Sequence, residues 1–313
     1  MKKLAVVAFG GNALLRGNQI GYAKEQEANA YDTTKNLINL LEDGFNLVIT
    51  HGNGPQVGNI LLQHEAGHSV YKIPKFPLDV CVAESQGSIG YMLEKQLRNV
   101  LKEHKINRNV VTFITEVVVD KNDPAFQNPT KPVGPFYLKE EADLLAKANN
   151  WIFKEDPRKR GWRRVVPSPK PFDVMNKELI KELVEEGNIV IAVGGGGIPV
   201  FYNENGTIEG VEAVIDKDLA SAVLAREIGA NAFFILTDVA KVCINFNKPN
   251  QQELDKLHVD EAKKYYSEGQ FPDGSMGPKV LAAISFCESS GNIAIITEAS
   301  QLNNKNAGTI IYK

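Results

Sequence analysis

An apolar segment that ends in four consecutive glycines restricts the fold of this chain more than any other feature. Ile189–Val193 has the length of a strand and no polar alternation, so both of its faces should be buried, as in a parallel sheet. Gly194–Gly197 follow directly. Such glycines let the backbone approach another group closely and turn its N–H groups outward, which favours an anion such as phosphate. From this stretch alone, a tight corner without a ligand is an equal alternative.

The same arrangement recurs where other expected strands end. The apolar runs Leu4–Phe9 and Asn46–Thr50 stop at the loops Gly10–Ala13 and Gly52–Gly58, and a further loop at Asp216–Asp218 leads into a helix. Ligands of open α/β sheets bind outside the carboxyl ends of the strands, where the helices that follow favour negative charge. These repeated ends predict one shared anion site.

Strand-like and helical segments alternate along most of the chain. Helices are expected at Ala23–Leu41, Ala83–Leu101, Leu219–Ile228, Asp260–Ser267 and Val280–Ser289, with one more opened by Pro55. Further strands are expected at Asn109–Ile114, Ala232–Leu236, Asn292–Ile296 and Thr309–Tyr312, with a hairpin at Val200–Ile208 and a strand-like run at Val211–Ile215. This alternation predicts an α/β class with a largely parallel sheet.

The segment from Val117 to about Pro171 differs from the rest because it is dense in proline and charge. We interpret it as an excursion from the sheet, an insert or lid with little regular structure. Its basic run Arg158–Arg164 is more typical of a solvated face than of a nucleic-acid site.

Composition narrows the class of protein. A net charge of −3 gives no electrostatic reason to expect nucleic acid or an anionic membrane as a partner. No apolar run approaches the length of a membrane span. Three cysteines without a CxxC pattern are typical of reduced thiols, so we expect a cytoplasmic protein.

Familiar site motifs are missing or weak. No GxxxxGK[ST] occurs, and the glycine loop after the second strand is one residue too long for GxGxxG. His64–His68 matches HExxH, which can bind zinc on a helix. Gly67 should weaken that helix, however, and no third ligand is evident, so we expect exposed polar residues at a helix end instead.

Three lysines lie beside the expected loops. Lys217 stands between two aspartates, Lys131 stands among prolines of the expected lid, and Lys279 follows a glycine loop. Each alone would ordinarily be solvent-exposed. Together they suit phosphoryl transfer between two anions, which needs fixed cations that offset the charge on the transferring group.

Several motifs together resemble the carbamate kinases of the amino-acid kinase superfamily. They are Gly10–Leu14, Thr50–Asn59, Ala83–Gly87, Pro129–Tyr137, Trp162–Pro169, Gly194–Val200 and Gly210–Ser221. The resemblance runs from Lys3 to the C-terminus and implies a three-layer αβα open sandwich with a mostly parallel central sheet and a small protruding lid subdomain. We expect an N-terminal substrate lobe over residues 1–212, with the lid at about 117–171, and a C-terminal nucleotide lobe over residues 213–313.

The resemblance also implies an activity. The family converts MgATP and carbamate to MgADP and carbamoyl phosphate, reversibly, and in fermenting cells it usually runs toward ATP as the last step of the arginine deiminase pathway. Magnesium would be held mainly by phosphate oxygens and water. Family members are homodimers, so we expect one here, with no nucleic-acid or membrane partner.

Residue roles follow from the resemblance by position. Three residues of the first loop match the phosphate cradle, and three of the second match the loop that holds the carbamoyl end: Gly10, Gly11 and Asn12, then Gly52, Asn53 and Gly54. Lys131 matches the lysine that the lid brings onto the substrate. Lys217 matches the catalytic lysine that bridges the transferring phosphoryl group, and Asp218 matches the aspartate that orients the lysines. The expected nucleotide-side residues are Asp238, Met276, Gly277 and Lys279.

Two rival functions stay open at this point. One is another acylphosphate-forming or related kinase of the same fold, with a different acceptor, which the Pro-rich lid and the Gly52–Gly58 loop argue against. The other is a non-catalytic nucleotide-binding sensor, which the intact lysines argue against. We expect the four-glycine turn to be close-packed and to help deliver Lys217, so that a side chain at Gly195 or Gly196 impairs activity.

Overall fold

A computed structural model describes residues 3–17, 19–156, 159–272, 274–302, 304 and 307–313, with the backbone alone of Asn12. Its centre is an eight-stranded sheet in the order β15-β17-β16-β12-β1-β2-β9-β3. The strands are β1 Lys3–Phe9, β2 Phe45–His51, β3 Val110–Thr112, β9 Ile189–Ile191, β12 Ala232–Thr237, β15 Lys256–His258, β16 Ile293–Glu298 and β17 Thr309–Tyr312. All neighbouring pairs run parallel except β16 and β17, which confirms the predicted sheet.

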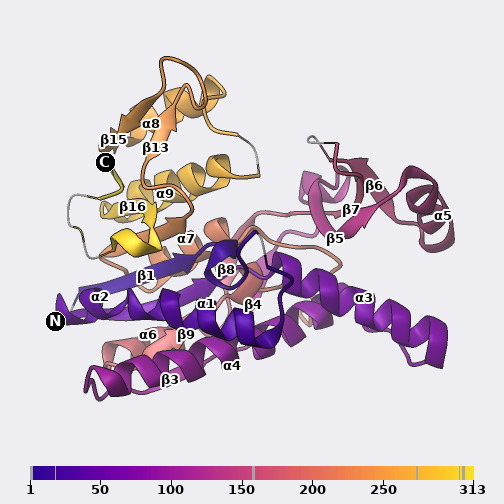
Figure 1. Cartoon of the computed structure of the whole chain (residues 1–313), viewed down its shortest axis with the longest axis horizontal. Helices are drawn as coiled ribbons and strands as arrows, with labels where there is room; N and C mark the ends of the chain where they lie inside the picture. Colours follow the sequence, from indigo (N-terminus) through magenta and orange to yellow (C-terminus); the bar gives the residue numbers. More distant parts are fainter. Residues whose placement is uncertain (1–2, 18, 157–158, 273, 303, 305–306) are drawn as a thin grey trace.

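Helices cover both faces of this sheet, as Figure 1 shows. One face carries α1 Ala23–Lys35, α2 Ile38–Glu42 and α4 Leu78–Glu103, and the other carries α6 Lys177–Glu185, α7 Lys217–Glu227, α8 Val259–Ser267 and α9 Met276–Ser290. Strand β1 contributes side chains to the cores on both faces of the sheet. Val6 and Ala8 pack into one core, and Val7 and Phe9 pack into the other. The period of two in a strand buried on both faces explains why its sequence shows no polar alternation.

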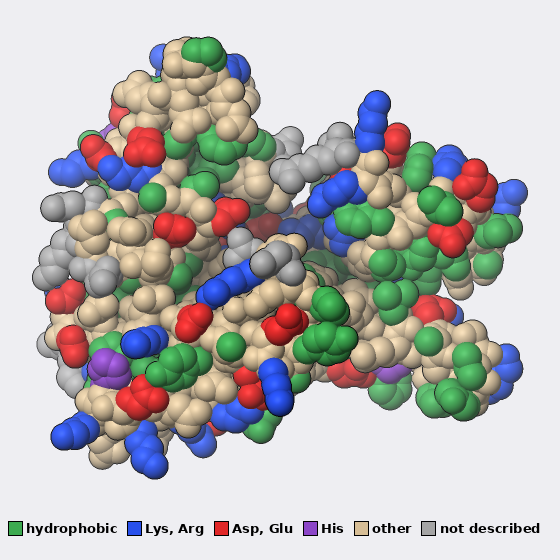
Figure 2. Space-filling model, in the orientation of Figure 1, with side chains coloured by type: hydrophobic (Ala, Val, Ile, Leu, Met, Phe, Trp, Pro, Cys, Tyr) green, Lys and Arg blue, Asp and Glu red, His purple; other side chains and the backbone are tan. Residues whose placement is uncertain are grey.

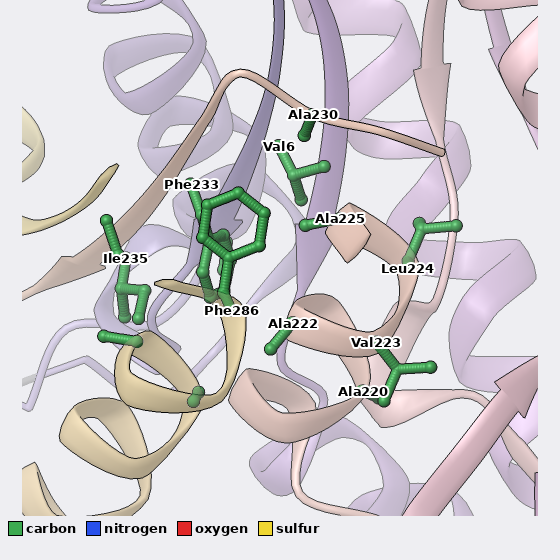
Figure 3. Close-up of a cluster of buried hydrophobic side chains, with 14 of the residues drawn as sticks. Val6, Ala220, Ala222, Val223, Leu224, Ala225, Ala230, Phe233, Ile235 and Phe286 are labelled. Carbon is green, nitrogen blue, oxygen red and sulfur yellow. The ribbon is translucent and has the colours of Figure 1, made fainter. Parts of the chain in front are cut away.

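The core beside the later helices joins the two halves of the chain. In Figure 3, side chains of α7 meet Val6 of β1 and the rings of Phe233 and Phe286. Those two rings, from β12 and α9, pack edge to face with centroids 5.6 Å apart. Burying a large apolar side chain such as Phe233 or Phe286 contributes roughly 1.5–3 kcal/mol. Because the side chains of α7 share this core, α7 and its N-terminus are fixed against the sheet.

The segment 117–171 has regular structure, so the prediction of little regular structure, which rested on its prolines, was wrong. It contains β5 Lys131–Tyr137, α5 Lys139–Asn149, β6 Ile152–Glu155 and β7 Trp162–Val166, which together form a protruding subdomain with the antiparallel strand order β5-β7-β6. Two prolines lie within β5, an edge strand, where a missing N–H donor is tolerated. Figure 1 shows this subdomain projecting beside α3 Gly54–Tyr71.

A second sheet links the subdomain to the central one. Its order is β11-β10-β4-β8, with β4 Glu116–Val119, β8 Pro171–Val174, β10 Ile198–Tyr202 and β11 Ile208–Gly210. Strands β10 and β11 are antiparallel, which confirms the predicted hairpin. The division of the chain into lobes at residues 212 and 213 stays a prediction.

Other boundaries differ from the predictions. The expected helix Ala23–Leu41 is two helices, since α1 ends at Lys35 and α2 begins at Ile38. Helix α9 begins at Met276, so Lys279 lies inside a helix rather than before one. Residues 211–215 form no strand. The hairpin β13 Val242–Ile244 and β14 Gln252–Leu254 was not predicted. Among the described residues, no helix is long and apolar enough to cross a bilayer.

Candidate active site

A cavity of about 580 Å³ opens at the carboxyl ends of the central strands. Figure 2 shows the hollow between the protruding subdomain at the right and the C-terminal elements at the upper left. Ten of the residues singled out from the sequence line this cavity: Gly11, Gly52, Asn53, Gly54, Lys131, Lys217, Asp218, Asp238, Met276 and Lys279. Each of the four loops predicted to meet, Gly10–Ala13, Gly52–Gly58, Gly194–Gly197 and Asp216–Asp218, contributes to this lining, whereas the roles assigned to the residues stay predictions.

Asp218 bonds two lysines that line the cavity. Its Oδ1 accepts from Lys217 Nζ at 2.6 Å and its Oδ2 accepts from Lys279 Nζ at 2.8 Å. Both lysines come from first turns, those of α7 and α9, so one buried carboxylate fixes two helix N-termini relative to each other. Helix N-termini add their own favourable field for an anion at this place.

Burial and charge act in opposite directions on this cluster. Burial alone would raise the pKa of Asp218, but Lys217 and Lys279 hold the pKa of that carboxyl well below its usual range. Burial lowers the pKa of Lys217 to about 8, although Asp218 opposes the shift. The carboxylate is therefore ionised and Lys217 remains mostly protonated near neutral pH.

A second ion pair joins the protruding subdomain to α7. Lys131 Nζ, at the start of β5, donates to Asp216 Oδ2 at 2.9 Å. Asp216 is the N-cap of α7, and its Oδ1 accepts from the backbone N–H groups of Asp218 and Leu219. No role was predicted for Asp216, because nothing in the sequence places a residue 85 positions away against it.

The loop after β2 forms another part of the cavity lining. Asn53 is buried and donates from Nδ2 to Ser85 Oγ at 2.8 Å. Pro55 lies in the first turn of α3, as predicted. Burial lowers the pKa of the neighbouring His51 to about 4, so its ring is neutral and carries no charge toward the cavity.

The four-glycine turn packs directly against Asn53 and against Ile215, which precedes Asp216. A Cβ at Gly195 would lie 2.2 Å from Asn53 Nδ2, and one at Gly196 would lie 2.4 Å from the carbonyl oxygen of Ile215. Gly195 also lines the cavity. The turn therefore sets the spacing between the Asn53 loop and the segment that leads into Lys217.

This packing gives a testable prediction for stability. Gly195→Ala should lower the free energy of unfolding by about 2–4 kcal/mol, because overpacking displaces buried Asn53 and alanine is strained at this left-handed φ of 67°. Gly206→Ala is the matched control, since its φ is 75° and its surroundings are open, so only about 1–2 kcal/mol of backbone strain applies. Chemical denaturation measures both, and equal losses would contradict the close packing.

The C-terminal side of the cavity is more apolar. Val239, Phe246 and Phe271 line it beside Met276 of α9, and Asp238 follows β12 with its Oδ1 accepting from Thr237 Oγ1 at 3.1 Å. Phe246 was not predicted to line the site, because its segment shows no motif and the hairpin β13–β14 was not predicted. Phe271 begins the proline and glycine loop that precedes Lys279, but no role was assigned to it. Apolar and aromatic side chains of this kind suit a nucleotide base.

Three predicted residues stand apart from this lining. Gly10 lines a neighbouring cavity of about 500 Å³, and this cavity shares four residues with the first: Gly11, Thr237, Asp238 and Lys279. Gly277 is buried in the first turn of α9 instead of facing the cavity. The side chain of Asn12 lies outside the described residues, so its predicted place is untested.

The HExxH residues form a separate cluster on α3. His64 Nε2 lies 3.1 Å from Glu84 Oε1, and His68 Nδ1 lies 3.0 Å from the carbonyl oxygen of Ile73. Gly67 does not end the helix, which continues to Tyr71. Within the described ranges, no three His, Cys, Asp or Glu side chains are grouped so that they could hold a metal ion.

Comparisons with known proteins agree with this geometry. The family model described as the amino acid kinase family matches residues 3–297. The chain is 54% identical over 296 residues to the carbamate kinase of Pyrococcus furiosus, covering 95% of this chain and 94% of the other. It is 49% identical over 317 residues to that of Lentilactobacillus hilgardii, covering 100% and 98%. The solved carbamate kinase of Giardia lamblia bound to AMP-PNP aligns with a TM-score of 0.92 at 43% identity, covering 100% and 99%.

Proposed function

The chain belongs to the amino acid kinase family and, within it, to the carbamate kinases, and from this premise we propose that it works mainly toward ATP. In that direction the phosphoryl group of carbamoyl phosphate passes to ADP, and carbamate is released. Carbamoyl phosphate is an acyl phosphate, whose phosphoryl group is transferred to ADP downhill in free energy. We place the reaction in arginine fermentation, as the last step of the arginine deiminase pathway.

The convergence of lysines supports phosphoryl transfer at this site, while the proposed direction and pathway rest on the family resemblance. Lys131, Lys217 and Lys279 come from three elements and line one cavity. In-line transfer between two anions needs fixed cations and alignment, and carbamate is already an anion, so no general base is required. We assign Lys217 to the transferring phosphoryl group, Lys131 to the carbamoyl end and Lys279 to the nucleotide phosphates. Asp218 orients Lys217 and Lys279, because its carboxylate bonds both of them.

Backbone N–H groups complete the proposed site. The first loop, Gly10–Asn12, cradles the phosphates, and the second, Gly52–Gly54, holds the carbamoyl group. Asp238 and Met276 contact the nucleotide from the C-terminal side, where both line the cavity. Gly277 lets the first turn of α9 lie close to the preceding loop, since a Cβ there would be 3.1 Å from the carbonyl oxygen of Pro272.

We propose magnesium as the metal of this site; held by the nucleotide's phosphates, it would offset charge on the phosphate oxygens. Of the described carboxylates in the cavity lining, Asp216 and Asp218 accept bonds from lysines and Asp238 accepts one from Thr237. This donor set fits an ion held mainly by phosphates and water, because it offers no carboxylate cage.

We also propose that the enzyme is a cytoplasmic homodimer, as the sequence resemblance implies. Cys81, Cys243 and Cys287 are free thiols, which suits a reducing compartment. Light scattering after size exclusion tests the dimer directly, and a mass near 34.4 kDa would contradict it.

An assay in the ATP-forming direction tests the proposed function. We expect ATP when the protein is mixed with MgADP and carbamoyl phosphate, and far less when acetyl phosphate replaces the carbamoyl compound. Coupled luciferase detection measures the product. Equal rates with both donors would favour a different acylphosphate kinase. ATP binding by calorimetry without any turnover would favour a nucleotide sensor instead.

A further inference from the structure

Asp216 has two separate duties in this structure. Its Oδ1 caps α7 through the backbone N–H groups of Asp218 and Leu219, at 2.9 and 3.4 Å. Its Oδ2 accepts from Lys131 Nζ at 2.9 Å, across 85 positions of sequence. Serine or asparagine caps a helix as well as aspartate does, so the cap alone does not require a carboxylate. The second oxygen and its charge serve Lys131.

The pair lies within a wider connection between the protruding subdomain and residues 211–216. Arg164 of β7 donates to Glu212 Oε2 at 3.0 Å, and the N–H of Val214 donates to the carbonyl oxygen of Pro167 at 3.0 Å. Arg164 is 8% exposed, although the sequence placed it on a solvated face, and its guanidinium stacks on Trp151 at 4.2 Å. The subdomain is thus bonded at three points to the segment that enters α7.

Charge also favours a carboxylate here. Lys131, Lys217 and Lys279 bring three positive charges to the cavity, and Asp218 bonds two of those lysines. Asp216 is the carboxylate that holds the third, so the described cluster keeps a small net positive charge before any ligand arrives. An ammonium group has three donors. One bond to Asp216 therefore leaves two Lys131 donors for an anion in the cavity.

We propose that Asp216 is a positioning residue, which holds the Lys131 ammonium at the cavity wall while fixing the helix turn that carries Lys217. The proposal rests on the proposed function, since it assumes that Lys131 binds carbamoyl phosphate. In the free enzyme Asp216 holds a side chain that is 33% exposed in one arrangement. Carbamoyl phosphate then binds without the entropic cost of ordering that side chain.

A double-mutant cycle tests the proposal. Asp216→Ser keeps the helix cap but is too short to hold Lys131, so the thermal midpoint should stay unchanged while the KM for carbamoyl phosphate rises about three- to tenfold. The KM for ADP should stay within about twofold, because Asp216 does not hold the nucleotide-side Lys279. Asp216→Ala, which loses the cap too, should lower the thermal midpoint and raise the same KM by a similar factor.

Lys131→Ala completes the cycle and tests the positioning role of Asp216 separately from the assigned role of Lys131. If Asp216 acts through Lys131, adding Asp216→Ser to Lys131→Ala should leave the KM for carbamoyl phosphate unchanged from that of Lys131→Ala alone. The same fold increase in both backgrounds would overturn the positioning role and leave the proposed function standing. A Lys131→Ala enzyme with a normal KM for carbamoyl phosphate would overturn the assigned role of Lys131, and the positioning role with it.

Discussion

Lys217→Ala is expected to lower kcat by about 10²–10³ while the KM for ADP changes little. The ammonium of Lys217 lies 2.6 Å from Asp218, at the N-terminus of α7, and its side chain lines the cavity. A cation held there by a buried carboxylate can stabilise charge on the phosphoryl group without reorganising during transfer. Initial rates of ATP formation at saturating substrates measure the effect.

Lys177→Ala is the matched control for this variant. Lys177 also begins a helix, α6, and also bonds to carboxylates, those of Asp173 and Glu227. It lies outside the cavity lining, so its loss should leave kcat within about twofold. Near-normal turnover by a folded Lys217→Ala enzyme would contradict the catalytic assignment of Lys217.

The central sheet was predictable because its strands are buried on both faces. Leu4–Phe9, Asn46–Thr50 and Ile189–Val193 carry that burial in their composition, and the glycines after them mark where the strands end. The carboxyl ends of parallel strands meet at one edge of the sheet. Local patterns were therefore enough to place the glycine loops after these three strands in one region with Lys217.

The protruding subdomain was not predictable in the same way. Prolines in β5 suggest irregular chain when only local propensity is considered, yet they occupy an edge strand where a sheet tolerates them. The basic run Arg158–Arg164 was judged correctly only in part. Lys159 and Arg160 are exposed as predicted, and Arg158 lies outside the described residues. Arg164 in β7, however, is buried against Trp151 and bonded to Glu212. Only the tertiary partner of each residue explains its environment.

The ion pairs of the site were predictable only in part, for a related reason. The spacing predicts that Lys217 and Asp218 are neighbours, but Lys279 reaches the same carboxylate from a helix 61 positions away. Pairs of this kind depend on how α7 and α9 pack on the sheet. The family resemblance supplied the roles of the lysines, and the structure adds the bonds among them.

Because Asp218 bonds both Lys217 and Lys279, we expect its substitution to have the other large effect on stability and turnover. Asp218→Asn replaces a buried carboxylate with an amide that cannot neutralise Lys217 and Lys279. Breaking a buried pair by removing one partner destabilises a protein by about 3–5 kcal/mol, and turnover should fall at least about 100-fold. Chemical denaturation and steady-state rates measure the two losses separately.

Glu227→Gln provides the matched control for Asp218→Asn. Glu227 also bonds two cations, Lys177 and Arg226, but its side chain is 26% exposed, so the change should cost no more than about 1 kcal/mol and leave turnover unaffected.

The pH dependence of the Asp218→Asn enzyme separates an electrostatic effect from simple misfolding. Burial and Lys279 both lower the pKa of Lys217, and Asp218 opposes them, so losing Asp218 lowers that pKa further below about 8. Lys217 should then be largely neutral at pH near 8 and regain its proton as the pH falls. We therefore expect kcat/KM of the variant, relative to the unsubstituted enzyme, to increase from about pH 8 down to about pH 6. A ratio that stays constant over this range would show that Asp218 does not act through the charge of Lys217.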